Sequence, residues 1–242
     1  MKRIALLALL TLTSALFAQA PATKVDASAP LPKRANARFY ELHAANLKRA
    51  KQPMGVLFLG DSITEGWSRV PEIWSKYYGE WQPANFGIGG DQTQHVLWRI
   101  EDGELDGVKP KVVVLMLGTN NTGTHTAEEI AAADTKIVRL IQKKIPDVKI
   151  LLLGIFPRGY RMSRTGVSDG WEERMKIIKA VNVELAKLDD GSSIRFLDIG
   201  ETFLDENGQI PADVMPDQLH PNAKGYEIWA EAMHPLLTEM MQ

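Results

Sequence analysis

The sequence contains a serine after an apolar run, and a histidine and an aspartate three residues apart in a loop, which are residue types suited to nucleophilic catalysis. Ser62 directly follows a short apolar run, and a serine hydroxyl attacks a carbonyl well only when a base takes its proton. Among the histidines, His220 lies in a loop with Asp217 three residues before it, close enough for the carboxylate to orient the imidazole. We therefore predict acyl transfer, with Ser62 as nucleophile, His220 as general base and Asp217 as the orienting residue.

Acyl transfer also needs hydrogen-bond donors directed at the developing oxyanion. Three groups are suited to this role: the backbone N–H of Ser62, the backbone N–H of Gly90 and the side-chain amide of Asn120. Each stands in a glycine-rich polar segment that directly follows an apolar run. We predict that these three donors converge on one point.

Other polar residues of the same segments are candidates for lining the substrate pocket. Asp61 and Asn121 flank the predicted nucleophile and the predicted amide donor, and His125 follows shortly afterwards. We expect Asp61 to brace its loop by hydrogen bonds rather than to react. The polar stretch 158–170 follows another apolar run and is expected to shape the pocket.

Short apolar runs alternate with amphipathic stretches along the chain, which predicts the elements that position these residues. Continuous apolar runs bounded by glycine or aspartate are typical of strands buried on both faces, as in a parallel sheet with helices on either side. Strands are predicted at 56–59, 84–86, 112–117, 150–153 and 194–197. Helices are predicted around 39–47 and at 72–78, 94–101, 127–144, 171–188 and 222–240. Ligands bind such sheets beyond the carboxyl ends of the strands, where the polar segments fall.

Four sequence blocks resemble those of the GDSL or SGNH hydrolases. They occur in the right order and are Gly60-Asp61-Ser62-Ile63, Gly90, Gly118-Thr119-Asn120-Asn121 and Asp217-x-x-His220. A Gly-Asp-Ser tripeptide is common by itself, but four ordered blocks at strand ends are specific. The resemblance implies a flavodoxin-like three-layer α/β/α sandwich with a five-stranded parallel sheet.

Two further segments, Asn85 to Asp91 and Gly154 to Gly159, indicate a particular group within the GDSL or SGNH hydrolases. Together with His95-Val96-Leu97-Trp98-Arg99, they are similar to the catalytic (alpha) subunits of platelet-activating factor acetylhydrolase IB. This similarity implies a short acyl group such as acetyl, no metal and no cofactor. Because those relatives form dimers, it also leaves a homodimer open.

The N-terminal residues have the pattern of a secretory leader. Lys2 and Arg3 precede an uncharged, mostly apolar run, and Ala18-Gln19-Ala20 matches a signal-peptidase site. A membrane anchor is the alternative, but a span needs about 20 apolar residues and this run is shorter. We predict a signal peptide at 1–20 cleaved after Ala20, a flexible tether at 21–33 and one hydrolase domain at 34–242, exported to the periplasm or secreted, with no membrane span in the mature chain.

Composition excludes several other classes of protein. The chain carries a net charge of −2, and the predicted mature chain has 26 basic and 30 acidic residues, which disfavours a nucleic-acid partner. It has no cysteine, hence no disulfide or thiolate site. No pair of histidines has the spacing of metal ligands.

The sequence favours an exported serine esterase acting on short-chain esters, acetyl esters above all, of a small molecule, a glycan or a lipid. A carbohydrate O-acetylesterase and an enzyme like platelet-activating factor acetylhydrolase are equally compatible with the blocks. The alternatives left open are a lysophospholipase or lipase-like esterase, and a catalytically silent protein that binds sugar or lipid.

Overall fold

The computed structural model describes residues 24–162 and 166–242, and its centre is a five-stranded sheet. The strands are β1 (Val56–Gly60), β2 (Ala84–Gly87), β3 (Val112–Met116), β4 (Lys149–Leu153) and β5 (Ile194–Leu197). All neighbouring pairs are parallel, in the order β2-β1-β3-β4-β5. This is the flavodoxin-like order, so the predicted fold class is confirmed.

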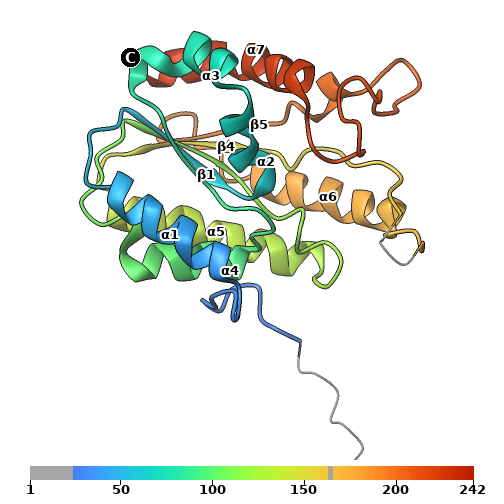
Figure 1. Cartoon of the computed structure of the whole chain (residues 1–242), viewed down its shortest axis with the longest axis horizontal. Coiled ribbons are helices and arrows are strands. Elements are labelled where there is room, and N and C mark those ends of the chain that lie inside the picture. The colour runs from blue at the N-terminus through green and yellow to red at the C-terminus, as the bar shows by residue number, and fades with distance from the viewer. Residues whose placement is uncertain (1–23, 163–165) are drawn as a thin grey trace, which may run out of the picture.

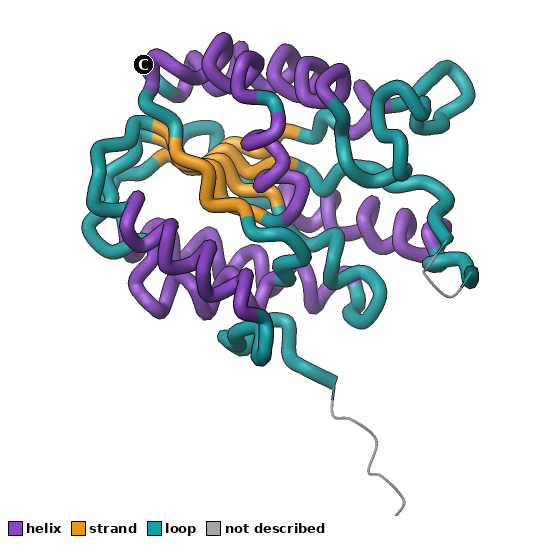
Figure 2. The backbone as a smooth tube through the Cα atoms, viewed as in Figure 1, coloured by secondary structure: helices purple, strands orange, loops and turns teal. Residues whose placement is uncertain are grey.

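Helices cover both faces of the sheet, so that the fold has three layers, with the sheet in the middle (Figure 1). The α-helices are α1 (Ala37–Arg49), α2 (Ser62–Glu65), α3 (Pro71–Tyr78), α4 (Thr93–Arg99), α5 (Ala127–Lys144), α6 (Trp171–Ala186) and α7 (Ala223–Met240). Single-turn 3-10 segments lie at Gly66–Arg69, Gly79–Trp81 and Gly200–Phe203, and a π-helical turn, Ile100–Glu104, extends α4. Figure 2 shows the sheet between the two helical layers.

The three central strands, β1, β3 and β4, are apolar almost along their whole length because both faces of the sheet are buried there. On one face, Leu57 and Leu59 of β1 belong to a core cluster shared with α4, α5 and α6. On the other face, Val56 and Phe58 belong to a cluster shared with α3 and α7, which includes the fully buried Trp229. Burial on both faces removes the period-two alternation of a half-exposed strand, which is why continuous apolar runs predicted these strands correctly.

The order of the strands places the polar segments beside one another. The chain moves from β1 to the edge strand β2 and then returns past β1 to form β3, so β1 and β3 are neighbours whose connections leave in opposite directions. Gly60 at the end of β1 is in register with Met116 at the end of β3. The segments beginning at Asp61 and Leu117 therefore emerge together at the topological switch point, where such folds bind ligands.

Residues 24–33 differ from the flexible tether predicted for 21–33. Ala27 is buried and its carbonyl accepts a hydrogen bond from Thr93 Oγ1 at 2.9 Å, and Leu31 N–H donates to Gln94 O at 3.0 Å. This part of the chain has no helical or strand periodicity, yet its backbone groups pair with the loop and helix that follow β2. The tether prediction is wrong for these ten residues because specific hydrogen bonds hold them.

The predicted leader, residues 1–20, lies outside the described residues, as do residues 21–23 of the predicted tether. Among the helices that the structure describes, none combines the length and apolarity needed to cross a bilayer.

Candidate active site

Ser62 is the first residue of the short helix α2, and three contacts fix this helix in place. Asp61 caps it by accepting a hydrogen bond from Ile63 N–H on Oδ1 at 2.9 Å. The Tyr226 hydroxyl of α7 donates to Ile63 O at 2.6 Å, and Asn85 Nδ2 of β2 donates to Thr64 O at 2.9 Å. Contacts from the sheet and from α7 thus hold Ser62 in place.

Gly60 makes the sharp strand-to-helix turn sterically feasible. A Cβ atom at this position would lie 2.2 Å from Thr64 Oγ1 and 2.5 Å from Met116 O. Both distances are well below contact distance, and one of the atoms is backbone. Any larger residue would push α2 away from β3 and displace the Ser62 side chain.

His220 reaches Ser62 from a loop 158 residues further along the chain. Ser62 Oγ lies 2.9 Å from His220 Nε2, and His220 Nδ1 lies 2.7 Å from Asp217 Oδ2. With Nδ1–H donating to the carboxylate, Nε2 is free to accept the serine proton. The structure thus places the three predicted residues in one hydrogen-bonded chain.

Asp217 also makes an ion pair that the sequence did not indicate. Arg161 Nη2 donates to Asp217 Oδ2 at 2.8 Å, and the two side chains are 30% and 43% exposed. Hydrogen bonds from His220 and the positive charge of Arg161 outweigh partial burial and lower the pKa of Asp217. The carboxylate therefore stays ionised at neutral pH. Arg161 belongs to the polar stretch expected to shape the pocket.

The predicted oxyanion donors lie on three adjacent loops. Neither the Ser62 N–H nor the Gly90 N–H donates to another residue in the described part of the chain. Asn120 Nδ2 donates to Asp91 O at 2.9 Å and, more weakly, to Asp61 Oδ2 at 3.2 Å. The two backbone donors are thus available, whereas the Asn120 amide is engaged with its own chain.

Asp61 is almost fully buried beneath Ser62. Burial raises the pKa of Asp61 to about 7, the hydrogen bond from Ile63 N–H opposes this rise, and the nearby charge of Asp91 adds to it. Asp61 uses Oδ1 for Ile63 N–H and Oδ2 for Asn120, which agrees with the bracing role expected for it.

Asn121 and His125 were expected to line the substrate pocket, and the structure corrects this expectation. Asn121 is fully buried, accepts a hydrogen bond from Thr93 N–H and donates to Thr93 Oγ1. His125 is buried as well, with its ring nitrogens 2.9 Å from Thr124 Oγ1 and 2.8 Å from Val25 O. Both side chains use their polar atoms to hold neighbouring segments, so neither offers a free polar group to a substrate.

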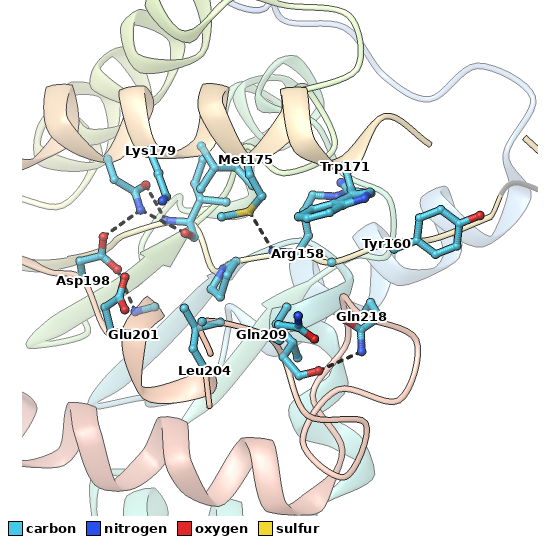
Figure 3. A pocket seen from close by; sticks show the side chains of 18 residues that line it. Arg158, Tyr160, Trp171, Met175, Lys179, Asp198, Glu201, Leu204, Gln209 and Gln218 are labelled. Carbon is cyan, nitrogen blue, oxygen red and sulfur yellow. Dashed lines mark hydrogen bonds between the residues drawn. The ribbon is translucent and has the colours of Figure 1, made fainter. Parts of the chain in front are cut away.

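A cavity of about 470 Å³ lies next to the His220 loop (Figure 3). Trp171, Met175 and Ile178 of α6 form one wall, with Leu204 and Gln218 among the residues opposite. The buried Arg158 lines this cavity and donates from Nη1 to Thr119 Oγ1 at 3.4 Å. The cavity therefore borders the loop of His220 through Gln218, and Arg158 connects its wall to the loop of Asn120.

A second, more open hollow of about 410 Å³ is lined by residues of the same loop. Its lining includes His220 itself, Asp217, Arg69 and Tyr226. The imidazole is thus reached by solvent from this side. Within residues 24–162 and 166–242, no group of three or more histidine, aspartate or glutamate side chains is arranged to hold a metal ion.

Comparison with known proteins assigns the family. The model of the GDSL-like lipase/acylhydrolase family matches residues 58–228. Platelet-activating factor acetylhydrolase IB subunit alpha2 of Rattus norvegicus is 38% identical over 192 residues, covering 79% of each chain. The chain belongs to the GDSL-like lipase/acylhydrolase family. This acylhydrolase is a carboxylic ester hydrolase, as its family and its relatives indicate.

Solved structures agree with the fold of this acylhydrolase. A GDSL-like lipase from Bacteroides thetaiotaomicron superposes with a TM-score of 0.66 at 18% identity, covering 83% of this chain and 97% of that one. A carbohydrate acetylesterase family member from Sinorhizobium meliloti superposes with a TM-score of 0.61 at 17% identity, covering 77% and 98%. At these identities the likeness concerns the fold alone.

Proposed function

We propose that this hydrolase cleaves short-chain acyl esters, acetyl esters above all, with Ser62 as nucleophile, His220 as general base and Asp217 as the residue that orients the base. The observation that carries the proposal is the hydrogen-bonded chain from Ser62 Oγ through the imidazole to the Asp217 carboxylate, with distances of 2.9 and 2.7 Å. Such a chain supplies both the activated hydroxyl and the acid needed later by the leaving group.

In the proposed reaction, His220 Nε2 takes the proton of Ser62 as Oγ attacks the ester carbonyl. The N–H groups of Ser62 and Gly90 bind the resulting oxyanion, and Asn120 joins them by releasing its longer bond to Asp61. The tetrahedral intermediate collapses, the C–O bond to the alcohol breaks, and His220 protonates the alcohol. Water then attacks the acyl-serine while His220 takes its proton, the bond between the acyl carbon and Ser62 Oγ breaks, His220 returns the proton to Oγ, and the carboxylic acid leaves.

The cavity beside α6 supports a proposal for the alcohol side of the substrate. The indole of Trp171 gives it an apolar wall, charged side chains such as Lys179 and Glu201 also line it, and Gln218 stands at the border with the His220 loop. An ester held at Ser62 could place a bulky leaving group there. Both an acetylated glycan, which presents apolar ring faces, and an acetylated lipid have such a group.

Export is part of the proposal and rests on the leader pattern of residues 1–20. Expression of the full chain in a bacterial host, followed by fractionation and mass determination, tests it. We expect the periplasmic or secreted protein to begin at Pro21. A full-length protein retained in the cytoplasm would contradict export without affecting the proposed chemistry.

The proposed chemistry is tested with purified protein and a chromogenic acetyl ester. Wild-type protein and its Ser62→Ala variant are compared at equal concentration, with circular dichroism as a check on folding. We expect the variant to fall to the background rate, because its alanine cannot form an acyl-enzyme. Equal rates in the two proteins would favour a silent binding protein instead.

A further inference from the structure

Gly90, the proposed oxyanion donor, lies in a tight turn whose central peptide can face either way. Asp91 N–H donates to Ile88 O at 3.1 Å, so Ile88–Asp91 form a β-turn with Gly89 and Gly90 in the middle. Gly90 has φ of +72°, as a type II turn requires at its third residue. Types I and II differ by a half-rotation of the central peptide, and two consecutive glycines impose little preference between them.

The orientation of this peptide matters because the Gly89 carbonyl and the Gly90 N–H are the two ends of one planar amide. If the carbonyl rotates, the N–H rotates with it and leaves the oxyanion position. The amide lies beside the nucleophile, since a Cβ atom built on Gly89 would be 3.8 Å from Ser62 Cβ. Any group that holds the Gly89 carbonyl therefore sets the direction of the Gly90 donor.

Lys33 is that group. Its Nζ donates to Gly89 O at 2.7 Å and forms an ion pair with Asp91 Oδ1 at 2.6 Å. Lys33 is only 11% exposed, Asp91 is fully buried, and Arg99 pairs with the second carboxylate oxygen of Asp91 at 2.9 Å. The ammonium is thus held between the carbonyl of Gly89 and the carboxylate of Asp91.

A second contact holds the preceding peptide. Gly89 N–H donates to Glu65 Oε2 at 2.6 Å, and Glu65 forms an ion pair with Arg38 of α1. The Gly89 backbone is therefore clamped by an anion on its N–H and by a cation on its carbonyl. A positive charge on the carbonyl oxygen also polarises the amide and strengthens the N–H donor at its other end.

We propose that Lys33 is a positioning residue for the oxyanion hole: it locks the Gly89–Gly90 peptide in the orientation that directs the Gly90 N–H at the reacting carbonyl. The proposal rests on the proposed function of Gly90. It gives residues 24–33 a part in catalysis, because this segment carries the ammonium to the Gly89 carbonyl.

The test compares Lys33→Met, which keeps the length of the side chain but removes its charge, with the wild-type protein. We expect kcat for a small acetyl ester to fall about 10- to 100-fold with KM within twofold, since the loss of a whole oxyanion donor costs roughly 100- to 1,000-fold. Affinity for a boronic acid, whose adduct with Ser62 carries a tetrahedral oxyanion mimic, should fall by a similar factor. Lys33→Arg should restore a large part of both.

Lys24→Met is the matched control, because it removes an exposed ion pair with Glu129 from the same segment without reaching the loop. We expect its kcat to stay within twofold of wild type. If Lys33→Met does not fold, Lys33→Gln, which keeps a donor for the carbonyl, is measured in the same way. Its kcat should fall below that of the wild-type protein, but by less than the factor expected for Lys33→Met.

Three results would overturn the proposal: kcat within twofold of wild type in Lys33→Met, an unchanged affinity for the boronic acid, or an equal loss in Lys24→Met. Its failure is distinguishable from failure of the proposed function. A reaction that depends on Ser62 but not on Lys33 removes only the positioning role, whereas a reaction that does not depend on Ser62 removes both.

Discussion

His220 is bound twice by Asp217. Its backbone N–H donates to Oδ1 at 2.7 Å, and its ring Nδ1 contacts Oδ2 at 2.7 Å. One carboxylate therefore holds both the backbone of the loop and the imidazole. It can do so because Asp217 precedes His220 by three residues. The adjacent Gln218 adopts a φ of +61°, which closes this tight loop.

Asp217→Asn separates these two functions of the carboxylate. The amide oxygen can still cap the His220 N–H, but the ring loses its negatively charged partner. We expect kcat to fall by about a hundredfold or more with little change in the melting temperature, because the imidazolium and its tautomer are no longer stabilised. Arg161→Gln serves as control and should stay within about fivefold, since exposed ion pairs contribute about 0.2–1 kcal/mol. Steady-state kinetics on an acetyl ester would contradict the assignment if both variants behaved alike.

Asn120→Ala tests the side-chain donor of the oxyanion hole. We expect kcat to drop about a hundredfold, corresponding to roughly 3 kcal/mol of transition-state stabilisation. Folding should survive, because the lost bonds to Asp91 O and Asp61 contribute about 1 kcal/mol each. Kinetics and thermal denaturation are measured on the same preparation. A variant of near-normal activity would remove Asn120 from the site.

Trp171→Ala tests the cavity beside α6. We expect KM for an acetyl ester of a bulky apolar alcohol, such as 2-naphthyl acetate, to rise about five- to thirtyfold, as the loss of about 1–2 kcal/mol of apolar contact implies. Methyl acetate, which is too small to reach the cavity, should react unchanged. Tyr40→Ala removes an exposed aromatic side chain of α1 and is the control. Equal effects on both esters would place the leaving group elsewhere.

His95→Gln tests a pH-dependent contribution to stability. Burial lowers the pKa of His95 to about 4, and its Nδ1 accepts a hydrogen bond from Gln92 N–H at 3.0 Å. Between about pH 6.5 and 4 the unfolded chain binds a proton that the folded protein excludes, so stability is present above pH 6.5 and is lost on acidification. Glutamine keeps an acceptor for the cap and does not titrate.

Urea unfolding at pH 7 and pH 5 measures this contribution. Wild-type protein should lose up to about 2 kcal/mol more than His95→Gln over this interval, as a shift of this size implies. A wild-type loss equal to that of the variant would show that His95 titrates normally in the folded state.

Local patterns in the sequence were sufficient for the sheet and for the residues that follow its strands. The apolar runs ending at Leu59 and Leu153 predicted β1 and β4 within one residue, because burial on both faces leaves a continuous run. The helix predicted at 127–144 is confirmed at both ends, whereas the helix predicted to reach Leu188 stops at Ala186. Helix ends depend on capping contacts, which periodicity does not encode.

The sequence by itself determined the family, the fold and the candidate residues for nucleophilic catalysis, because each of these depends on residue type and on short spacing. Only the tertiary structure decided which polar side chains face the site. Asn121 and His125 are turned into the protein by hydrogen bonds to distant segments, and Lys33 is brought to Gly89 from a stretch with no periodic pattern. These hydrogen bonds join residues that are far apart in the chain, so the partners come within contact distance only after the sheet has formed.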